Sequence, residues 1–215
     1  MTFKAELLIF DLDGTLADTK DDIATSVNLT LKELGLPEEA PGVIYTYIGS
    51  GVRRLIQQAV GEAEGERFRE AMRIFRGHYM THLLDTTKLY PGIDGVLDHF
   101  RSKKMAVVTN KPQAYADPIA AGLKIRNRFD LILGGDNGLP LKPDPKMLLT
   151  VLEKLSADPK RTVMIGDGLH DIHASRAAGI AVCAVGYGLG DPDELRRAGP
   201  DFFCETVDDL MRVVV

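Results

Sequence analysis

The sequence contains little cysteine, and this excludes one class of protein at once. Two cysteines, Cys183 and Cys204, occur in 215 residues, which is too few for a disulfide framework and does not match a CxxC spacing. Neither thiol has the positively charged or helix N-terminal surroundings that favour a reactive thiolate. We therefore expect two inert cysteines in a protein of the reducing cytoplasm.

The chain also lacks an excess of positive charge and any long hydrophobic run. Its 26 Lys and Arg against 31 Asp and Glu give a net charge of −5, so the chain as a whole is not attracted to nucleic acid or to an anionic membrane. No apolar stretch approaches the ~20 residues that span a bilayer, and residues 1–6 lack the pattern of a signal peptide. We expect no nucleic-acid partner, no membrane partner and a mature start at residue 1. An anionic substrate would need positive charge supplied locally.

Internal repeats and low-complexity tracts are absent as well, and what is present is typical of an α/β protein. Hydrophobic residues make up 45% and charged residues 27%, as in ordinary globular proteins, and the length suits one complete core with an insertion. Short apolar runs typical of buried parallel strands alternate with helical patterns, which predicts a doubly wound parallel sheet. The predicted strands are residues 7–10, 105–108, 131–133, 162–165 and 180–185, and helical patterns include 143–155 and 170–178.

One long segment interrupts the alternation. No convincing strand occurs between the first predicted strand and Tyr90. We therefore predict a small all-helical domain, residues 17–86, inserted into an α/β core made of residues 1–16 and 87–215. The segments with helical spacing are residues 21–34, 50–60 and 66–83.

Polar residues follow four of the predicted strands. The carboxyl ends of parallel strands meet at one edge of a sheet, where ligands bind in open α/β folds, so we expect these side chains to share one rim. Each pattern taken alone is more often a turn or a helix cap than a site. Their recurrence after four strands is what predicts a site. The residues are Asp11, Asp13, Thr109, Asn110, Lys142, Asp167 and Asp171.

The charges on this rim indicate the chemistry. Neighbouring carboxylates repel one another unless a cation neutralises them, and Mg²⁺ is the usual oxygen-liganded cation beside a phosphate. Asp11 and Asp13 are two residues apart, so one can act as nucleophile while the other transfers protons. Thr109, Asn110 and Lys142 can donate hydrogen bonds to phosphoryl oxygens. The residues therefore favour a magnesium-dependent enzyme that acts on a small phosphorylated metabolite.

The same residues carry a resemblance to a known family. In order and across the whole core, the sequence resembles the four motifs of the haloacid dehalogenase superfamily of phosphatases, with DLDGTL from Asp11, TN from Thr109, KP from Lys142, and GD from Gly166 followed by Asp171. The predicted helical insertion looks like that superfamily's small helical cap. The runs FDLDGT and VTNKP, and the GGD that precedes Lys142, are similar to phosphoglycolate phosphatases in particular.

The resemblance implies a role for each residue of the rim. Asp11 would attack phosphorus and form an aspartyl-phosphate, and Asp13 would protonate the leaving alcohol and then activate water. Thr109 and the adjacent Asn110 amide would hold the phosphoryl group. Lys142 would neutralise nucleophile and phosphate together. The implied reaction is hydrolysis of a phosphomonoester, with 2-phosphoglycolate as the expected substrate.

The resemblance also implies a magnesium site. Asp167 would bind Mg²⁺ together with the Asp11 carboxylate and the Asp13 main-chain carbonyl, and Asp171 would orient that site without binding the metal itself. Gly168 is a departure, because many relatives have serine there. The glycine would loosen a supporting hydrogen bond but removes no expected ligand.

The predicted insertion offers one candidate for substrate recognition. Residues 48–54 enter a predicted helix after two glycines, so backbone amides near Gly49 suit an anion, and Arg53 can bind a substrate carboxylate with two hydrogen bonds. The alternative, to which we give equal weight, is that Arg53 and Arg54 lie on a solvated face. A cap of this kind would close over the substrate and exclude water.

Three further patterns are weaker. His78 and His82 have the spacing of a metal-binding pair, but no third ligand is near in the sequence, and we expect ordinary helix residues. His170 and His173 are expected on a helix surface near the rim, where a substrate role is possible but not favoured. The glycine-rich residues 186–190 lack GxGxxG spacing and are predicted to form a loop.

Other functions of the same fold were weighed against these residues. A hydrolytic dehalogenase has no alcohol to protonate and would lack Asp13, and a phosphonate hydrolase would need a cap lysine, whereas Lys20 and Lys32 lie early in the insertion. A phosphosugar mutase would need cap residues that residues 17–86 do not show. A pyrophosphatase stays open, and a non-catalytic phosphate-binding protein would be expected to have lost one of the catalytic groups. The sequence leaves open whether the protein is a monomer or a homodimer.

Overall fold

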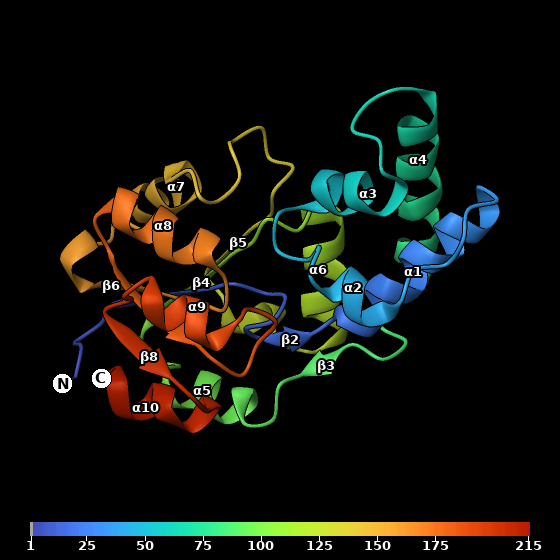
Figure 1. The fold of residues 1–215 in the computed structure, drawn as a ribbon. Coiled ribbons are helices and arrows are strands. Elements are labelled where there is room, and N and C mark those ends of the chain that lie inside the picture. Colours follow the sequence, from blue (N-terminus) through green and yellow to red (C-terminus); the bar gives the residue numbers. More distant parts are fainter. Residues whose placement is uncertain (1) are drawn as a thin grey trace.

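The computed structural model describes residues 2–215 and contains a six-stranded sheet whose strands all run parallel. The strand order is β5-β4-β1-β6-β7-β8 (Figure 1). From β1 the chain therefore builds one side of the sheet first and then crosses back to build the other, as in the predicted doubly wound sheet, which is confirmed. The strands are β1 (Leu7–Phe10), β4 (Lys104–Val108), β5 (Leu131–Leu133), β6 (Thr162–Gly166), β7 (Ala181–Val185) and β8 (Phe202–Cys204).

Helices cover both faces of this sheet because its strands are apolar on both sides. In β1, Leu8 and Phe10 face one hydrophobic cluster, and Leu7 and Ile9 face another; all four side chains are fully buried. The helices of the first face are α5 (Ile93–His99), α6 (Gln113–Gly122) and α10 (Leu210–Val213). Those of the second are α7 (Lys146–Lys154), α8 (Leu169–Ala178) and α9 (Pro192–Arg197).

The strand order reverses between β1 and β6, and this places the site. The two strands are neighbours in register, with Phe10 opposite Ile165, so the residues that follow them emerge side by side. The chain leaves β1 toward β4 and later leaves β6 toward β7, so the connections diverge at this point. A crevice at the carboxyl ends of the strands results, which is where ligands bind in such sheets.

The remaining helices pack mainly on one another beside the sheet and are called the cap below (Figure 1). Helix α1 packs against both α4 and α2, and α3 also packs against α4. Three of these helices lie where helical spacing was expected. The helix that periodicity did not indicate, α2, has five residues, which is too few to show a period. The cap helices are α1 (Lys20–Glu33), α2 (Pro41–Tyr45), α3 (Val52–Val60) and α4 (Glu66–Thr81).

The expectation of no strand before Tyr90 is wrong. Strand β2 (Ala17–Asp18) pairs antiparallel with β3 (Lys88–Leu89), so the chain enters and leaves the cap through a two-stranded ribbon. Strand β8 was also not predicted. Segments of two or three residues carry no periodicity, and pairing forms them only when the chain is already folded. Short 3₁₀ turns occur at Arg126–Arg128, Pro159–Arg161 and Val207–Asp209.

The two cysteines lie on neighbouring strands, β7 and β8. Both thiols are free and buried, with their sulfur atoms 3.4 Å apart. The hydrogen bond with Cys204 and burial raise the pKa of the Cys183 thiol, which disfavours a reactive thiolate.

Among residues 2–215, no helix combines the length and the hydropathy needed to cross a membrane.

Candidate active site

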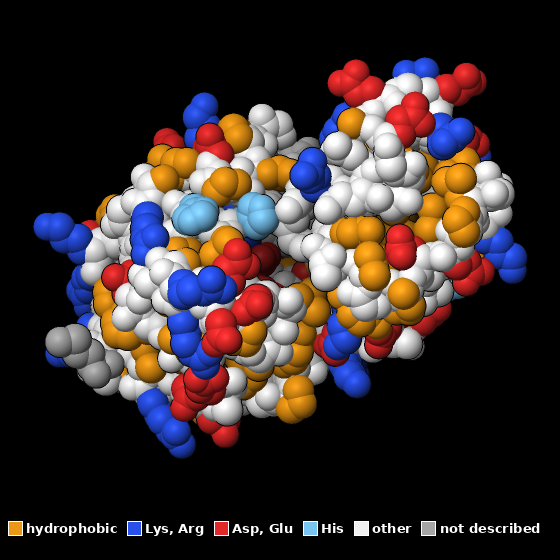
Figure 2. Space-filling model, viewed as in Figure 1, with side chains coloured by type: hydrophobic (Ala, Val, Ile, Leu, Met, Phe, Trp, Pro, Cys, Tyr) orange, Lys and Arg blue, Asp and Glu red, His pale blue; other side chains and the backbone are white. Residues whose placement is uncertain are grey.

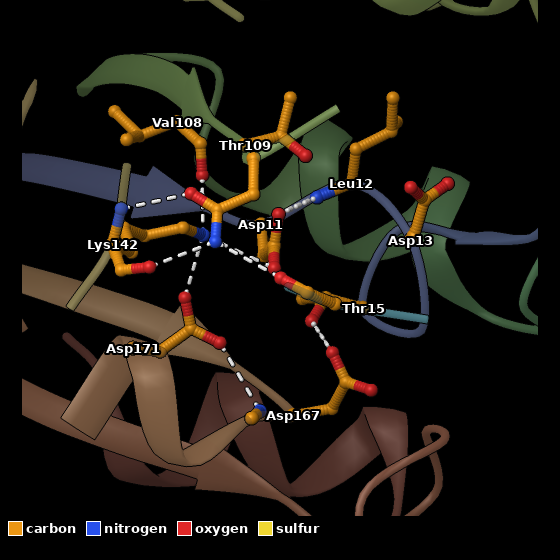
Figure 3. A network of polar contacts seen from close by, with 12 residues as sticks. Asp11, Leu12, Asp13, Thr15, Val108, Thr109, Lys142, Asp167 and Asp171 are labelled. Carbon is orange, nitrogen blue, oxygen red and sulfur yellow. Dashed lines mark hydrogen bonds and ion pairs between the residues drawn. The ribbon is translucent and has the colours of Figure 1, made fainter. Parts of the chain in front are cut away.

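The ends of three neighbouring strands bring the candidate residues together (Figure 3). Strand β1 pairs with β4 on one side and with β6 on the other. Asp11 directly follows β1, Thr109 follows β4 and Asp167 follows β6. These residues therefore project from adjacent strands at one edge of the sheet. They lie far apart in the sequence and side by side in the fold.

Lys142 is the buried cation of this edge. Its ammonium donates to the Val108 carbonyl oxygen at 2.7 Å and to Asp171 Oδ1 at 2.6 Å, and it lies 3.1 Å from Asp11 Oδ2. Burial alone would lower the pKa of Lys142, but the charges of Asp11 and Asp171 outweigh it and raise the pKa. Lys142 therefore stays charged and holds two carboxylates in place.

Asp11 is held on both of its oxygens. Its Oδ1 accepts a hydrogen bond from the Leu12 N–H at 2.7 Å, while Oδ2 faces Lys142. Burial raises the pKa of Asp11 to about 6, Lys142 opposes that shift, and the charges of Asp171 and Asp13 add to it. The carboxylate is thus oriented by the protein and costly to ionise without more positive charge nearby.

Asp167 is held from the other side of the crevice. The Thr15 hydroxyl donates to its Oδ1 at 2.9 Å and the Leu189 N–H to its Oδ2 at 2.8 Å. Burial raises the pKa of Asp167 to about 7, and the charges of Asp11 and Asp171 add to the shift. Leu189 lies in residues 186–190, which form a loop as expected but contribute a contact to the site that the sequence did not reveal.

These carboxylates form a donor set that suits a hard cation. Oxygens of Asp11, Asp167 and Asp171 lie within 4.8 Å of one another, the only such acidic or histidine-containing group found among residues 2–215. All the donors are oxygen, which suits Mg²⁺ or Ca²⁺ better than a softer metal. Burial and then the charges of neighbouring carboxylates raise the Asp11 and Asp167 pKa values, and a bound cation offsets both effects. The residues present therefore fit a divalent metal.

The histidines of the cap take no part in this cluster. His78 Nε2 lies 2.9 Å from Glu33, and His82 Nδ1 lies 2.7 Å from Asp85. Each ring has its own carboxylate partner at the surface. In the core, His170 Nε2 lies 3.3 Å from the Ser50 hydroxyl of the cap, so one histidine near the rim contacts the cap directly.

Asp13 points away from the acidic cluster, and its partners were not predicted. Lys111 Nζ lies 2.8 and 2.9 Å from the two oxygens of Asp13, and the Thr19 hydroxyl donates to Oδ1 at 2.6 Å. Lys111 directly follows Asn110 on the same rim. This position in the sequence was the signal that could have marked Lys111 as a residue of the site. Thr19 is the N-cap residue of α1, but its hydroxyl binds Asp13 rather than the helix backbone.

Two glycines allow the backbone to approach Asp167. Gly14 has a φ of +79°, and a Cβ there would lie 2.0 Å from Asp167 Oδ2. A Cβ on Gly188 would lie 2.4 Å from the Asp167 Cβ. No side chain fits in either place, so glycine is needed where the first turn and the 186–190 loop meet Asp167.

Asn110 connects the core to the cap. Its side-chain NH₂ donates to the carbonyl oxygens of Gly49 and Lys142, both at 2.9 Å, and its Oδ1 accepts from the Lys142 N–H at 2.8 Å. The Asn110 side chain is therefore bound to backbone groups. The Thr109 hydroxyl accepts a hydrogen bond from the Lys111 N–H at 3.2 Å.

Asp11 and Asp13 border two different cavities in the hollow between core and cap, where Figure 2 shows acidic side chains. The first, of about 380 Å³, is lined by Asp167, Asp171 and other polar residues. The second, of about 40 Å³, lies under the cap and has mostly apolar and aromatic walls, with Lys111 among the lining residues. The two aspartates thus separate a polar compartment from a small apolar one.

Arg53 lies outside both of these cavities. Its guanidinium lies 5.0 Å from the centre of the Phe68 ring, and the side chain is exposed. It lines a neighbouring cavity of about 900 Å³ together with Arg76 and Asn110. Gly49 therefore lines both cavities that Asp11 borders, whereas Arg53 lines only the neighbouring cavity.

Comparisons with known proteins agree with this geometry. The family model described as haloacid dehalogenase-like hydrolase matches residues 8–185. A phosphoglycolate phosphatase of Chromobacterium violaceum is 37% identical over 94% of this chain and 92% of its own length, and one of Aquifex aeolicus is 37% identical over 97% and 96%. A crystal structure of a predicted phosphoglycolate phosphatase from Haemophilus somnus superposes with a TM-score of 0.91 at 31% identity, covering 97% of both chains.

The family match includes the first strand and extends to the last residue of β7, so it contains all four rim segments. The matched relatives extend over nearly the whole chain, including the cap helices. The resemblance expected from the motifs is thereby confirmed. The chain belongs to the haloacid dehalogenase-like hydrolases and is similar along its whole length to members named phosphoglycolate phosphatase.

Proposed function

We propose that this protein is a magnesium-dependent phosphatase that hydrolyses 2-phosphoglycolate through an aspartyl-phosphate on Asp11. The observation that carries the proposal is the setting of the Asp11 carboxylate. It is oriented by the Leu12 N–H and Lys142 and lies beside a second acid, Asp13, at the border of a polar cavity. The names of the matched relatives supply the expected substrate.

The first half of the reaction uses Asp11 and Asp13 in turn. An Asp11 oxygen attacks phosphorus, the bond from phosphorus to the ester oxygen breaks, and the phosphoryl group remains on Asp11. Asp13 gives its proton to the leaving oxygen, which departs as an alcohol. Lys142 offsets the negative charge that nucleophile and phosphoryl oxygens bring together. Thr109 lines the small cavity that Asp11 also borders and can donate to a phosphoryl oxygen.

The second half reverses the role of Asp13. Now ionised, Asp13 takes a proton from a water molecule as that water attacks the phosphorus of the aspartyl-phosphate. The bond between phosphorus and Asp11 breaks, inorganic phosphate forms and the Asp11 carboxylate is restored. Lys111 is the ion-pair partner of Asp13 in the structure.

Asp11, Asp167 and the Asp13 main-chain carbonyl would hold Mg²⁺, with Asp171 orienting the site through Lys142 and the Gly168 N–H. When bound, the metal supplies positive charge that neutralises and orients the phosphoryl group. Asp171 has no acid–base role in this scheme, because its two oxygens already accept hydrogen bonds from Lys142 and from the Gly168 N–H.

The cap would enclose the leaving group. We assign residues 17–86 to it, because helices α1–α4 lie between the paired strands of the β2–β3 ribbon. Gly49 and Ser50 already contact the core through Asn110 and His170. Arg53 lies on the Phe68 ring outside the cavities that Asp11 borders, so it could reach a substrate carboxylate only if its guanidinium left that ring. We further propose a cytoplasmic enzyme whose partner is the small phosphorylated metabolite.

The proposal is tested by phosphate release from a panel of esters, with Mg²⁺ and again with EDTA. The panel contains 2-phosphoglycolate, sugar phosphates, nucleotides and pyrophosphate. Metal-dependent release with a preference for 2-phosphoglycolate is expected. A preference for another ester or for pyrophosphate would contradict the proposed substrate and would leave the proposed mechanism in place. No release from a folded protein would contradict the enzyme and favour a phosphate-binding protein.

A further inference from the structure

Tyr79 carries a buried hydroxyl with no partner. The residue lies on α4 of the cap and is 2% exposed. Its ring stacks on Phe75, with the ring centres 5.4 Å apart, and meets the edge of Tyr115 at 4.9 Å. Within residues 2–215, no hydrogen-bond partner is found for its hydroxyl. A buried hydroxyl without a partner costs free energy, so its retention calls for an explanation.

The position of Tyr79 suggests what the missing partner is. Tyr79 lines the small cavity of about 40 Å³ that also contains Asp11, Asp13, Thr109 and Lys111. Asp11 and Asp13 also border the polar cavity of the acidic cluster, and cap residues line both cavities. A phosphate ester with its phosphoryl group at Asp11 in the polar cavity would extend its leaving group into the small one. At about 40 Å³ the small cavity has room for only a few atoms, which suits a short leaving group.

The Tyr79 side of the cavity carries two groups that can bind an anion. Burial and then the charge of Asp13 raise the pKa of Tyr79 well above its usual value, so the phenol remains a hydrogen-bond donor. Asp22, whose charge also acts on Tyr79, is already bound by Thr86 and Thr87. The nearby cation is the Lys111 ammonium, which lies 4.8 Å from the centre of the Tyr79 ring and is paired with Asp13. One cation and one unused donor therefore lie together among apolar walls.

We propose that Tyr79 and Lys111 bind the carboxylate of the leaving group, which makes the substrate class the phosphate esters of short hydroxy acids. The Tyr79 hydroxyl donates one hydrogen bond to this carboxylate and Lys111 provides its counter-charge. This inference rests on the proposed function for the position of the phosphate. It assigns selectivity to a cap residue that no sequence motif singled out.

The test compares two esters in the wild type and in Tyr79→Phe. The substitution removes one oxygen and keeps the ring that packs on Phe75 and Lys111. It is expected to lower kcat/KM for 2-phosphoglycolate about tenfold, as loss of a hydrogen bond to a charged group does, and to change kcat/KM for ethyl phosphate less than about twofold. The melting temperature should stay equal or rise. Equal losses for both esters, or no loss for 2-phosphoglycolate, would overturn the inference.

Two controls separate this inference from the proposed function. Tyr90→Phe should leave kcat/KM for both esters unchanged. Tyr90 lies next to Tyr187 and lines neither cavity that Asp11 borders. Binding of 2-phosphoglycolate and of inorganic phosphate is also measured by calorimetry in an Asp11→Asn background, where turnover plays no part. In that background, Tyr79→Phe should weaken the binding of 2-phosphoglycolate and leave the binding of inorganic phosphate unchanged. Selective weakening supports the inference even if the wild type hydrolyses none of the esters, and unchanged or undetectable 2-phosphoglycolate binding overturns it even if the wild type is active.

Discussion

The core side of the site and its cap side treat their polar groups in opposite ways. On the core side, Lys142, Asp167 and Asp171 are buried and bound by backbone groups or by one another. On the cap side, Arg53 is exposed, and the buried Tyr79 hydroxyl has no partner within residues 2–215. Groups that are fixed before the substrate arrives lower the cost of reorganisation in the transition state. Unused donors instead gain their partner from the ligand.

This difference indicates that the reaction depends on the core and the choice of substrate on the cap. The buried carboxylate Asp22 makes the contrast sharper, because it lies in the cap and is fully bound there, accepting hydrogen bonds from the Thr86 and Thr87 N–H groups. Its role is to hold the end of the cap to α1. Substituting equivalent groups in the two regions should therefore have different consequences.

The largest effect on activity is expected from Asp11→Asn. Asparagine keeps the size of the side chain but cannot attack phosphorus, so kcat should fall by about 10⁴-fold or more, as when a nucleophile is removed. Phosphate release measures the loss, and circular dichroism should show an unchanged fold. Asp22→Asn is the matched control in the cap. It should lower the stability of the protein but leave kcat within a few-fold of the wild-type value. Normal turnover by Asp11→Asn would contradict the covalent mechanism.

Lys142→Met should damage both activity and stability. Methionine fills the space but leaves Asp11 and Asp171 without their buried cation and the Val108 carbonyl without its donor. Breaking a buried ion pair on one side costs about 3 kcal/mol, and the phosphoryl charge loses its counter-ion. Urea unfolding gives the change in free energy. A variant as stable as the wild type would show that Lys142 does not hold the core side together.

The stability of the metal-free protein should depend on pH through Asp167. Its pKa rises from 3.8 to about 7 on folding, so between these values the folded state holds more protons than the unfolded state. Stability from this group is therefore lost as the pH rises through that window. In EDTA, the wild type should lose melting temperature relative to Asp167→Asn between about pH 5 and about pH 8.

Mg²⁺ should reverse this loss at the upper end of the window, because it binds the ionised carboxylates and competes with their protons. The apparent affinity for Mg²⁺, measured by calorimetry, should fall as the pH is lowered through about 7. Identical pH profiles for the wild type and Asp167→Asn would contradict the raised pKa. An Mg²⁺ affinity independent of pH would place the metal elsewhere.

A smaller effect is expected from Arg53→Ala. The structure places this guanidinium on Phe68, next to rather than inside the nucleophile's cavity. The KM for 2-phosphoglycolate should rise only about threefold, in the range of an exposed ionic contact. Arg54→Ala is the matched control, since Arg54 is exposed one position later, and its kinetics should match the wild type. A rise in KM of about a hundredfold for Arg53→Ala would make Arg53, not Tyr79, the main carboxylate ligand.

The smallest effect is expected from Gly168→Ser. A Cβ at this position would lie 3.4 Å from Asp171 Oδ2 and meets nothing closer, and the residue is the N-cap of α8. Serine would add a helix-capping hydroxyl worth a few tenths of a kcal/mol relative to glycine. A slightly higher melting temperature with unchanged kcat is expected. A large drop in kcat would show that the glycine is needed for the metal site.

The parts of the fold that could be predicted are those with long or repeated patterns. The apolar runs of β1 and β6 are buried on both faces, so they were recognisable without knowing their neighbours. The helix spacing of residues 66–83 likewise marked α4. Strands β2, β3 and β8 have two or three residues each. Their identity depends on a partner strand that the sequence does not reveal.

The site divides in the same way. Asp11 directly follows a predicted strand and Asp167 follows another after a single glycine, so the rule that strand ends meet was enough to bring them together. Lys111 stood on the same rim, but its pairing with Asp13 could not be read from position alone. Tyr79 lies in a helix pattern where an aromatic residue is most often part of the core. Only its missing hydrogen-bond partner distinguishes it.

The sequence by itself determined the parallel sheet, the order of the rim residues and the family, because each depends on local patterns that are contiguous in the chain. The tertiary structure alone decided which side chains share a cavity. Lys111 and Tyr79 are separated by 32 positions in the sequence, yet the Lys111 ammonium lies 4.8 Å from the Tyr79 ring. Such contacts depend on how the cap lies over the core, and that depends on packing between surfaces distant in sequence rather than on any single segment.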